Sequence, residues 1–93
     1  MKTFLYSILA TVMLAGAANA ACYADYKAKQ DNPLRLHYGV AAVRGDCSVG
    51  NAASQLSGRL SSGGWELLNI LSVFEDAQLD DKKDSAGEYF LRF

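Results

Sequence analysis

The spacing of apolar residues changes its period once along the chain, and this change restricts the fold more than any other feature. A first stretch has apolar residues at alternate positions: Leu34, Leu36, Tyr38, Val40 and Ala42. A period of two predicts a strand with one buried face. A second stretch has apolar residues at the spacing of one helical stripe: Val49, Ala52, Ala53, Leu56 and Leu60. The fold therefore combines a strand with an amphipathic helix.

Glycine, proline and polar residues set the limits of these elements. Pro33 blocks helix at the preceding residue and opens the strand over residues 34–44. Ser48 or Asp46 can cap the start of the helix, and the pair Gly63-Gly64 can end it. The nearly continuous apolar run over residues 65–74 then predicts a central strand that is buried on both faces.

The C-terminal third alternates between polar and apolar composition. Residues 75–87 are polar and predict a long loop or at most one or two helical turns, whereas residues 88–93 are aromatic enough for a last strand. The chain is thus expected to be a small two-layer α+β domain, with one helix on a three-stranded, mainly antiparallel sheet in the order strand-helix-strand-strand. We prefer an arrangement in which the last strand lies between the other two. The expected core contains Val49, Ala52, Leu56, Leu60, Leu36, Tyr38, Val40 and Leu91.

The first residues have the pattern of a bacterial secretory signal peptide. Lys2 precedes an uncharged apolar run over residues 4–15, and small residues at Ala18 and Ala20 favour cleavage between Ala20 and Ala21. The run is too short for a typical membrane anchor. Cys22 opens the alternative of a lipid-anchored accessory protein, but Asn19 stands where a lipoprotein site usually has a bulky aliphatic residue. Residues 1–20 are therefore expected to be removed, leaving a periplasmic or secreted protein.

The two cysteines predict a disulfide. Cys22 and Cys47 are the only pair in a short exported chain, in which an even cysteine count usually means a covalent bridge. The bridge would tether an N-terminal segment, residues 21–33, to an α+β domain over residues 34–93. Composition leaves residues 22–30 open between helix and strand. The two cysteines of a disulfide must lie close together. The strand after Pro33 carries the chain about 33 Å away, whereas a helix over residues 22–30 would span only about 13 Å in the same direction. The bridge therefore requires either an extended conformation for residues 22–30 or a bend in the strand.

The sequence contains no recognisable catalytic, cofactor or metal-binding motif. His37 is the only histidine, and its neighbours at alternate positions supply no ligand, so we expect a solvent-facing strand histidine. Trp65 is expected to pack in the core because it follows a helix stop. Tyr23 and Tyr26 lie outside the apparent core elements and, with His37, are the candidate partner-binding residues.

Charge excludes two classes of partner. Removing Lys2 with the signal peptide leaves eight Lys and Arg against ten Asp and Glu, a formal charge of −2. This balance provides no basic stripe for nucleic acid and no cationic face for anionic lipid. We therefore expect a non-enzymatic protein that binds another protein or an envelope component. The alternatives are a small periplasmic enzyme with an unrecognised site and the lipid-anchored accessory protein.

One junction resembles a known family. Gly64-Trp65-Glu66-Leu67, after a short helix that ends in glycine, is similar to the helix-to-strand junction of domain-of-unknown-function family 4177. Residues 36–44 and 89–93 would match the first and last strands of that family, so the resemblance covers about residues 36–93. The chain departs from the family in its N-terminal extension with cysteines and its long connection over residues 75–87. The resemblance implies a fold and no assigned activity.

Overall fold

The structure is a computed structural model that describes residues 21–93, so the expected signal peptide and its cleavage site at Ala20 lie outside the described residues. Within this part of the chain, no helix is long and apolar enough to span a bilayer. The elements are, in order, β1 (Cys22–Gln30), β2 (Arg35–Val43), α2 (Val49–Ser62), β3 (Glu66–Phe74), the 3-10 turn η1 (Asp76–Gln78), α3 (Leu79–Ala86) and the 3-10 turn η2 (Gly87–Tyr89).

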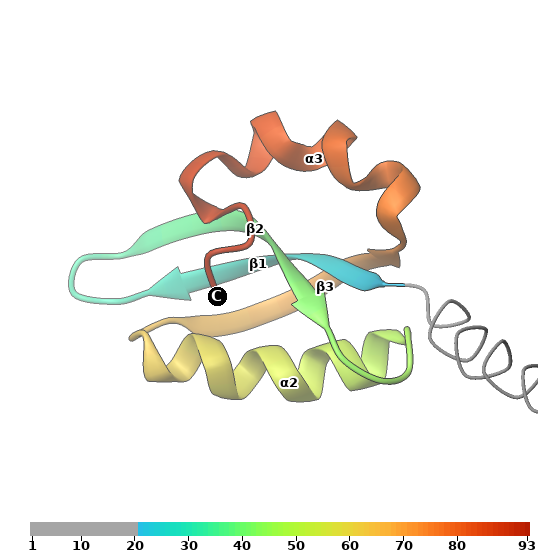
Figure 1. Ribbon diagram of the computed structural model, residues 1–93. Helices are drawn as coiled ribbons and strands as arrows, with labels where there is room; N and C mark the ends of the chain where they lie inside the picture. The colour runs from blue at the N-terminus through green and yellow to red at the C-terminus, as the bar shows by residue number, and fades with distance from the viewer. Residues whose placement is uncertain (1–20) are drawn as a thin grey trace, which may run out of the picture.

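The three strands form one antiparallel sheet in the order β2-β1-β3. Helix α2 packs on one face of this sheet, which confirms the predicted α+β class (Figure 1). The N-terminal segment supplies the third strand: β1 occupies the place between the other two that we expected the C-terminal residues to take. The run at residues 66–74 is confirmed as a strand, but β3 lies at the edge of the sheet and not at its centre.

The C-terminal residues add very little to the sheet. The residues expected to form a whole strand make one parallel bridge, between Phe90 and Val40, in which the Leu91 N–H donates to the Val40 carbonyl at 2.8 Å. Positive φ angles at Gly87 and Leu91, 55° and 57°, turn the backbone on both sides of this bridge. A backbone that turns at these points cannot continue as a strand.

Helix α2 has the limits that its sequence predicts. The Ser48 hydroxyl accepts a hydrogen bond from the Asn51 N–H at 3.2 Å, so Ser48 and not Asp46 is the N-cap. Gly63 ends the helix, and its N–H returns to the carbonyls of the last turn. Ala52, Leu56 and Leu60 are completely buried as expected. Val49 is 51% exposed, so the first residue of the stripe does not belong to the core.

The face of β2 that meets α2 is the opposite of the one predicted. Ala41 and Val43 belong to the core beneath the helix, together with Ala24 and Ala28 of β1, whereas Leu36 is 65% exposed. Both alternate sets of β2 contain apolar residues, so periodicity alone could not choose between them. The helix covers the set with small side chains, which allow it to approach the sheet closely.

The second face of the sheet is covered over part of its area. Helix α3, about two turns long as expected, lies over it (Figure 1). The buried residues of this second cluster are Val40, Phe74 and Ala86, and Tyr23, Tyr38, Leu79 and Phe90 pack against them. Each face of the sheet therefore has its own apolar cluster.

Candidate binding surface

The part of the second sheet face next to the β1–β2 turn is open. A hollow of about 250 Å³ lies there, lined by Lys27, Leu36, His37, Tyr38 and Leu68. We call these five residues the open half-face, although the ring of His37 is buried among aromatic side chains and adds little exposed area to it. Leu36 and Leu68, on the two edge strands, are 65% and 47% exposed, and Lys27 comes from the central strand between them. Large apolar side chains so exposed around one hollow are typical of an interaction surface.

Two irregularities in β3 accompany its exposed leucines. The pairing register with β1 shifts between Asp25 and Tyr26 and again between Lys27 and Ala28. At each shift one residue of β3 has no partner on β1, and these residues are Leu71 and Leu68. A bulge redirects side chains and twists the strand, so both leucines are exposed on a strand that otherwise pairs regularly. A bulged edge is also a poor template for pairing with a further strand.

A buried carboxylate anchors the covered part of the same face. Asp25 accepts hydrogen bonds from the Tyr38 hydroxyl at 2.8 Å and the Ser72 hydroxyl at 2.7 Å, and the Lys82 ammonium of α3 lies 3.3 Å away. Burial alone would raise the pKa of Asp25, but the hydrogen bonds from Ser72 and Tyr38, with Lys82, hold it below its usual value. Burial and the bond to Asp25 raise the pKa of Tyr38. This network holds the three strands and α3 together.

Lys27 is the cation of the open half-face. No residue among those described forms an ion pair with its ammonium group, whereas Lys29 pairs with Asp31 and Glu66. Lys27 is exposed and lies opposite Tyr38 in the β1–β2 register. The surface thus combines apolar walls with one positive charge that has no ion-pair partner among residues 21–93.

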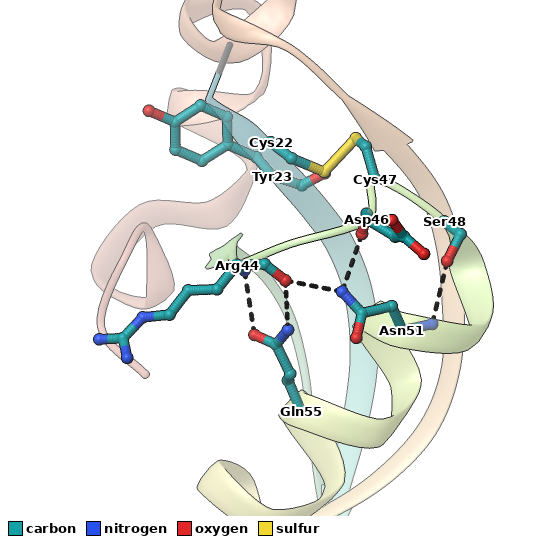
Figure 2. The surroundings of a disulfide bond; sticks show 8 residues. All are labelled: Cys22, Tyr23, Arg44, Asp46, Cys47, Ser48, Asn51 and Gln55. Atoms are coloured by element: carbon teal, nitrogen blue, oxygen red, sulfur yellow. Dashed lines mark hydrogen bonds between the residues drawn. A yellow bond between two sulfur atoms is a disulfide. The ribbon is translucent and has the colours of Figure 1, made fainter. Parts of the chain in front are cut away.

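The predicted disulfide is present. Cys22 at the start of β1 is bonded to Cys47 in the loop before α2, with Cα atoms 5.5 Å apart (Figure 2). The extended return that this bridge requires is provided by β1, which runs antiparallel to β2 along its whole length. The same loop is held by Asn51, whose side-chain amide donates to the carbonyls of Arg44 and Asp46 at 2.7 and 2.8 Å.

His37 lies in the core, contrary to the expected solvent-facing position. It is 8% exposed, and its Nε2 lies 2.9 Å from the Tyr26 hydroxyl. Its ring stacks on Tyr89 at 3.7 Å and meets the edge of Trp65 at 4.3 Å, with Phe93 also stacked nearby. Burial, and then the charge of Arg92, lower the pKa of His37. Burial raises the pKa of Tyr26 to about 12.

The candidate partner-binding residues do not form one surface. Tyr26 has no exposed area and His37 is almost fully enclosed, so their side chains are closed to a partner. Tyr23 is half-buried and stacks on Phe74 beneath α3. Tyr26 packs in the cluster beneath α2 and Tyr23 in the cluster beneath α3, because residues 22–30 form the central strand of the sheet. His37 belongs to β2 and is enclosed by aromatic side chains. Trp65 is buried, as predicted.

The described residues do not bring catalytic groups together in an accessible site. No group of three potential metal ligands occurs in residues 21–93. Tyr26 and His37 are in contact but buried, and every oxygen of the Asp25 carboxylate already has a partner. The accessible features are the leucines and the lysine of the open half-face. Sequence reasoning missed them because it placed Leu36 in the core, and no residue pattern announced the bulges at Leu68 and Leu71.

Comparison of the chain with models of protein families, with curated proteins and with solved structures finds no match. Membership of domain-of-unknown-function family 4177 therefore stays a prediction.

Proposed function

We propose that this chain is an exported, non-enzymatic binding protein that takes an extended apolar segment of another protein on its open half-face. The observation that carries the proposal is the pair of leucines, Leu36 and Leu68, exposed on opposite edge strands around one hollow. A segment lying between them would bury both side chains and meet Lys27 at the floor. An acidic residue in the partner segment would form an ion pair with Lys27.

Binding is favoured over catalysis because the titratable groups are already engaged. A candidate acid or base needs to reach a substrate. The Asp25 carboxylate is used in holding α3 to the sheet, and the His37 ring is closed in by three aromatic side chains. An unrecognised enzyme would need one of these groups to open, whereas the open half-face is accessible as it stands.

Export is supported by two independent features. The disulfide fits an oxidising compartment, and residues 1–20 have the pattern of a signal peptide. The disulfide also argues against lipid anchoring, since a lipoprotein cysteine carries its lipid on the sulfur atom that Cys22 uses to bond Cys47. Mass measurement of the mature protein tests this part: a chain beginning at Ala21 is expected, and a diacylated Cys22 would overturn it.

The binding surface is tested by capture from periplasmic extract with immobilised protein. We expect a captured protein to be retained by the wild type and lost by the double variant Leu36→Ser, Leu68→Ser. Val49→Ser is the matched control, because Val49 is also exposed, at 51%, but belongs to α2 on the other face of the sheet. Retention by the double variant, or equal loss in the control, would exclude the open half-face as the docking site.

A further inference from the structure

A second hollow, of about 330 Å³, is lined by Arg44, Gln55 and Arg59. Arg44 directly follows β2, while Gln55 and Arg59 are one turn apart on α2. Residues four apart on a helix lie on the same side, so both α2 side chains face the edge strand. The hollow therefore lies between the helix and β2, away from the open half-face.

The walls of this hollow are fixed by hydrogen bonds. The Gln55 amide pairs with the backbone of Arg44, accepting from its N–H at 3.1 Å and donating to its carbonyl at 2.6 Å (Figure 2). Arg59 donates from Nη2 to the Ala42 carbonyl of β2 at 2.7 Å. An arginine held in place in this way loses less freedom when it binds a ligand.

The hollow carries two positive charges for which the described part of the chain supplies no counterion. Neither Arg44 nor Arg59 forms an ion pair with any residue from 21 to 93. Burial, and then the charge of Arg44, lower the pKa of Arg59, so the two guanidinium groups repel one another. Arg59 makes one hydrogen bond, and its Nε is enclosed without a partner. The Asp46 side chain points toward Ser48, whereas Arg44 extends in the opposite direction (Figure 2).

We propose that this hollow binds a phosphate group, as inorganic phosphate or as a phosphate monoester. Guanidinium groups donate paired N–H bonds to the oxygens of phosphate, and such charge-assisted bonds are about twice as strong as neutral ones. Two unpaired cations match the charge of a phosphate monoester, about −1.5 to −2 at neutral pH, better than that of a monocarboxylate. Binding would relieve the repulsion between Arg44 and Arg59.

The proposal is tested by titrating the purified disulfide-bonded protein with inorganic phosphate and with glycerol phosphate at constant ionic strength, followed by amide chemical shifts. We expect saturable shifts around residues 44, 55 and 59. Arg44→Gln should weaken the affinity about tenfold or more, the loss expected when one charge-assisted bond is removed. Arg59→Lys, which keeps the charge but removes the planar fork, should weaken it as well.

Arg35→Gln is the matched control, because Arg35 is an exposed arginine that does not line this hollow. It should bind phosphate like the wild type. Absence of saturable shifts would overturn the proposal. An equal loss of affinity in Arg35→Gln would overturn it as well, because phosphate would then respond only to the net charge of the protein. Equal affinity for succinate at the same ionic strength would overturn the assignment to phosphate. A glycerol phosphate affinity above that of inorganic phosphate would support a monoester as the ligand.

Discussion

At the scale of single residues, the packing of Tyr26 depends on a glycine in the neighbouring strand. Gly39 lies opposite Tyr26 in the β1–β2 register, and a Cβ at this position would overlap the Tyr26 ring and hydroxyl. The absent side chain lets the ring pass close to the backbone of β2 and place its hydroxyl at His37. Glycine is needed here for close approach and not for backbone freedom.

We therefore expect Gly39→Ala to lower the free energy of unfolding by about 1 to 3 kcal/mol through overpacking. Gly58→Ala is the control, for which we expect a change in the free energy of unfolding of the opposite sign. Gly58 lies inside α2 with open space around its Cα, so alanine there should stabilise the protein by about 0.5 to 1 kcal/mol. Denaturant titration measures both changes. A neutral Gly39→Ala would mean that Tyr26 does not occupy the position described.

At the scale of elements, α2 depends on a short buried stripe. Leu56 is completely buried at the middle of the helix, and Leu60 is buried one turn later. Leu56→Ala should lower the free energy of unfolding by about 2 to 5 kcal/mol, since the cavity adds to the lost burial. Val49→Ala, on the exposed first turn, should change it by less than about 0.5 kcal/mol. Similar effects of the two substitutions in thermal unfolding would show that the stripe is assigned wrongly.

The disulfide connects two elements and should be structural. Replacing both Cys22 and Cys47 with Ala should lower the stability by about 2 to 5 kcal/mol, because the unfolded chain loses its cross-link. Partner capture through the open half-face should persist well below the melting temperature, since the bridge lies at the other end of β1. A thiol assay of the denatured wild type is expected to find no free thiol. Two reactive thiols per chain would contradict the bridge.

Much of the element order could be predicted, whereas the side-chain exposure could not. The change of period located β2 and α2, and the glycine pair ended the helix. Cysteine parity with simple geometry required either an extended course for residues 22–30 or a bent strand, and the structure has the extended course. The composition of β2 could not reveal which of its faces α2 covers, because both faces carry apolar residues. Leu36 lies on one face and Ala41 on the other. The bulges at Leu68 and Leu71 arise from pairing with β1, which a single strand does not encode.

At the scale of the whole molecule, two buried groups make stability depend on pH in the same direction. The folded protein disfavours protonated His37 because its pKa is lowered, so the unfolded chain binds the proton more readily. Stability is therefore expected to fall as the pH drops below the ordinary histidine value of about 6.5. Asp25, whose pKa is also lowered, contributes stability that is lost in a second window, below about pH 3.9.

The first window can be isolated with His37→Phe, which keeps an aromatic ring among Trp65, Tyr89 and Phe93. This variant should show a flat free energy of unfolding between pH 7 and 5, where the wild type loses stability. Urea titrations at several pH values measure the difference. The loss below pH 4 should remain in His37→Phe, because Asp25 is unchanged. An equal slope in both proteins between pH 7 and 5 would assign the proton uptake to another group.

The central position of β1 also governs the order in which the sheet can assemble. β1 precedes both of its partners in the chain: its neighbour β2 follows directly, but its other partner, β3, follows only after α2. Until then one edge of β1 has no strand beside it. The disulfide closes within residues 22–47 and needs nothing from β3. In an oxidising compartment the covalent bond can therefore form on the β1–β2 hairpin alone, which then serves as a template for the last strand.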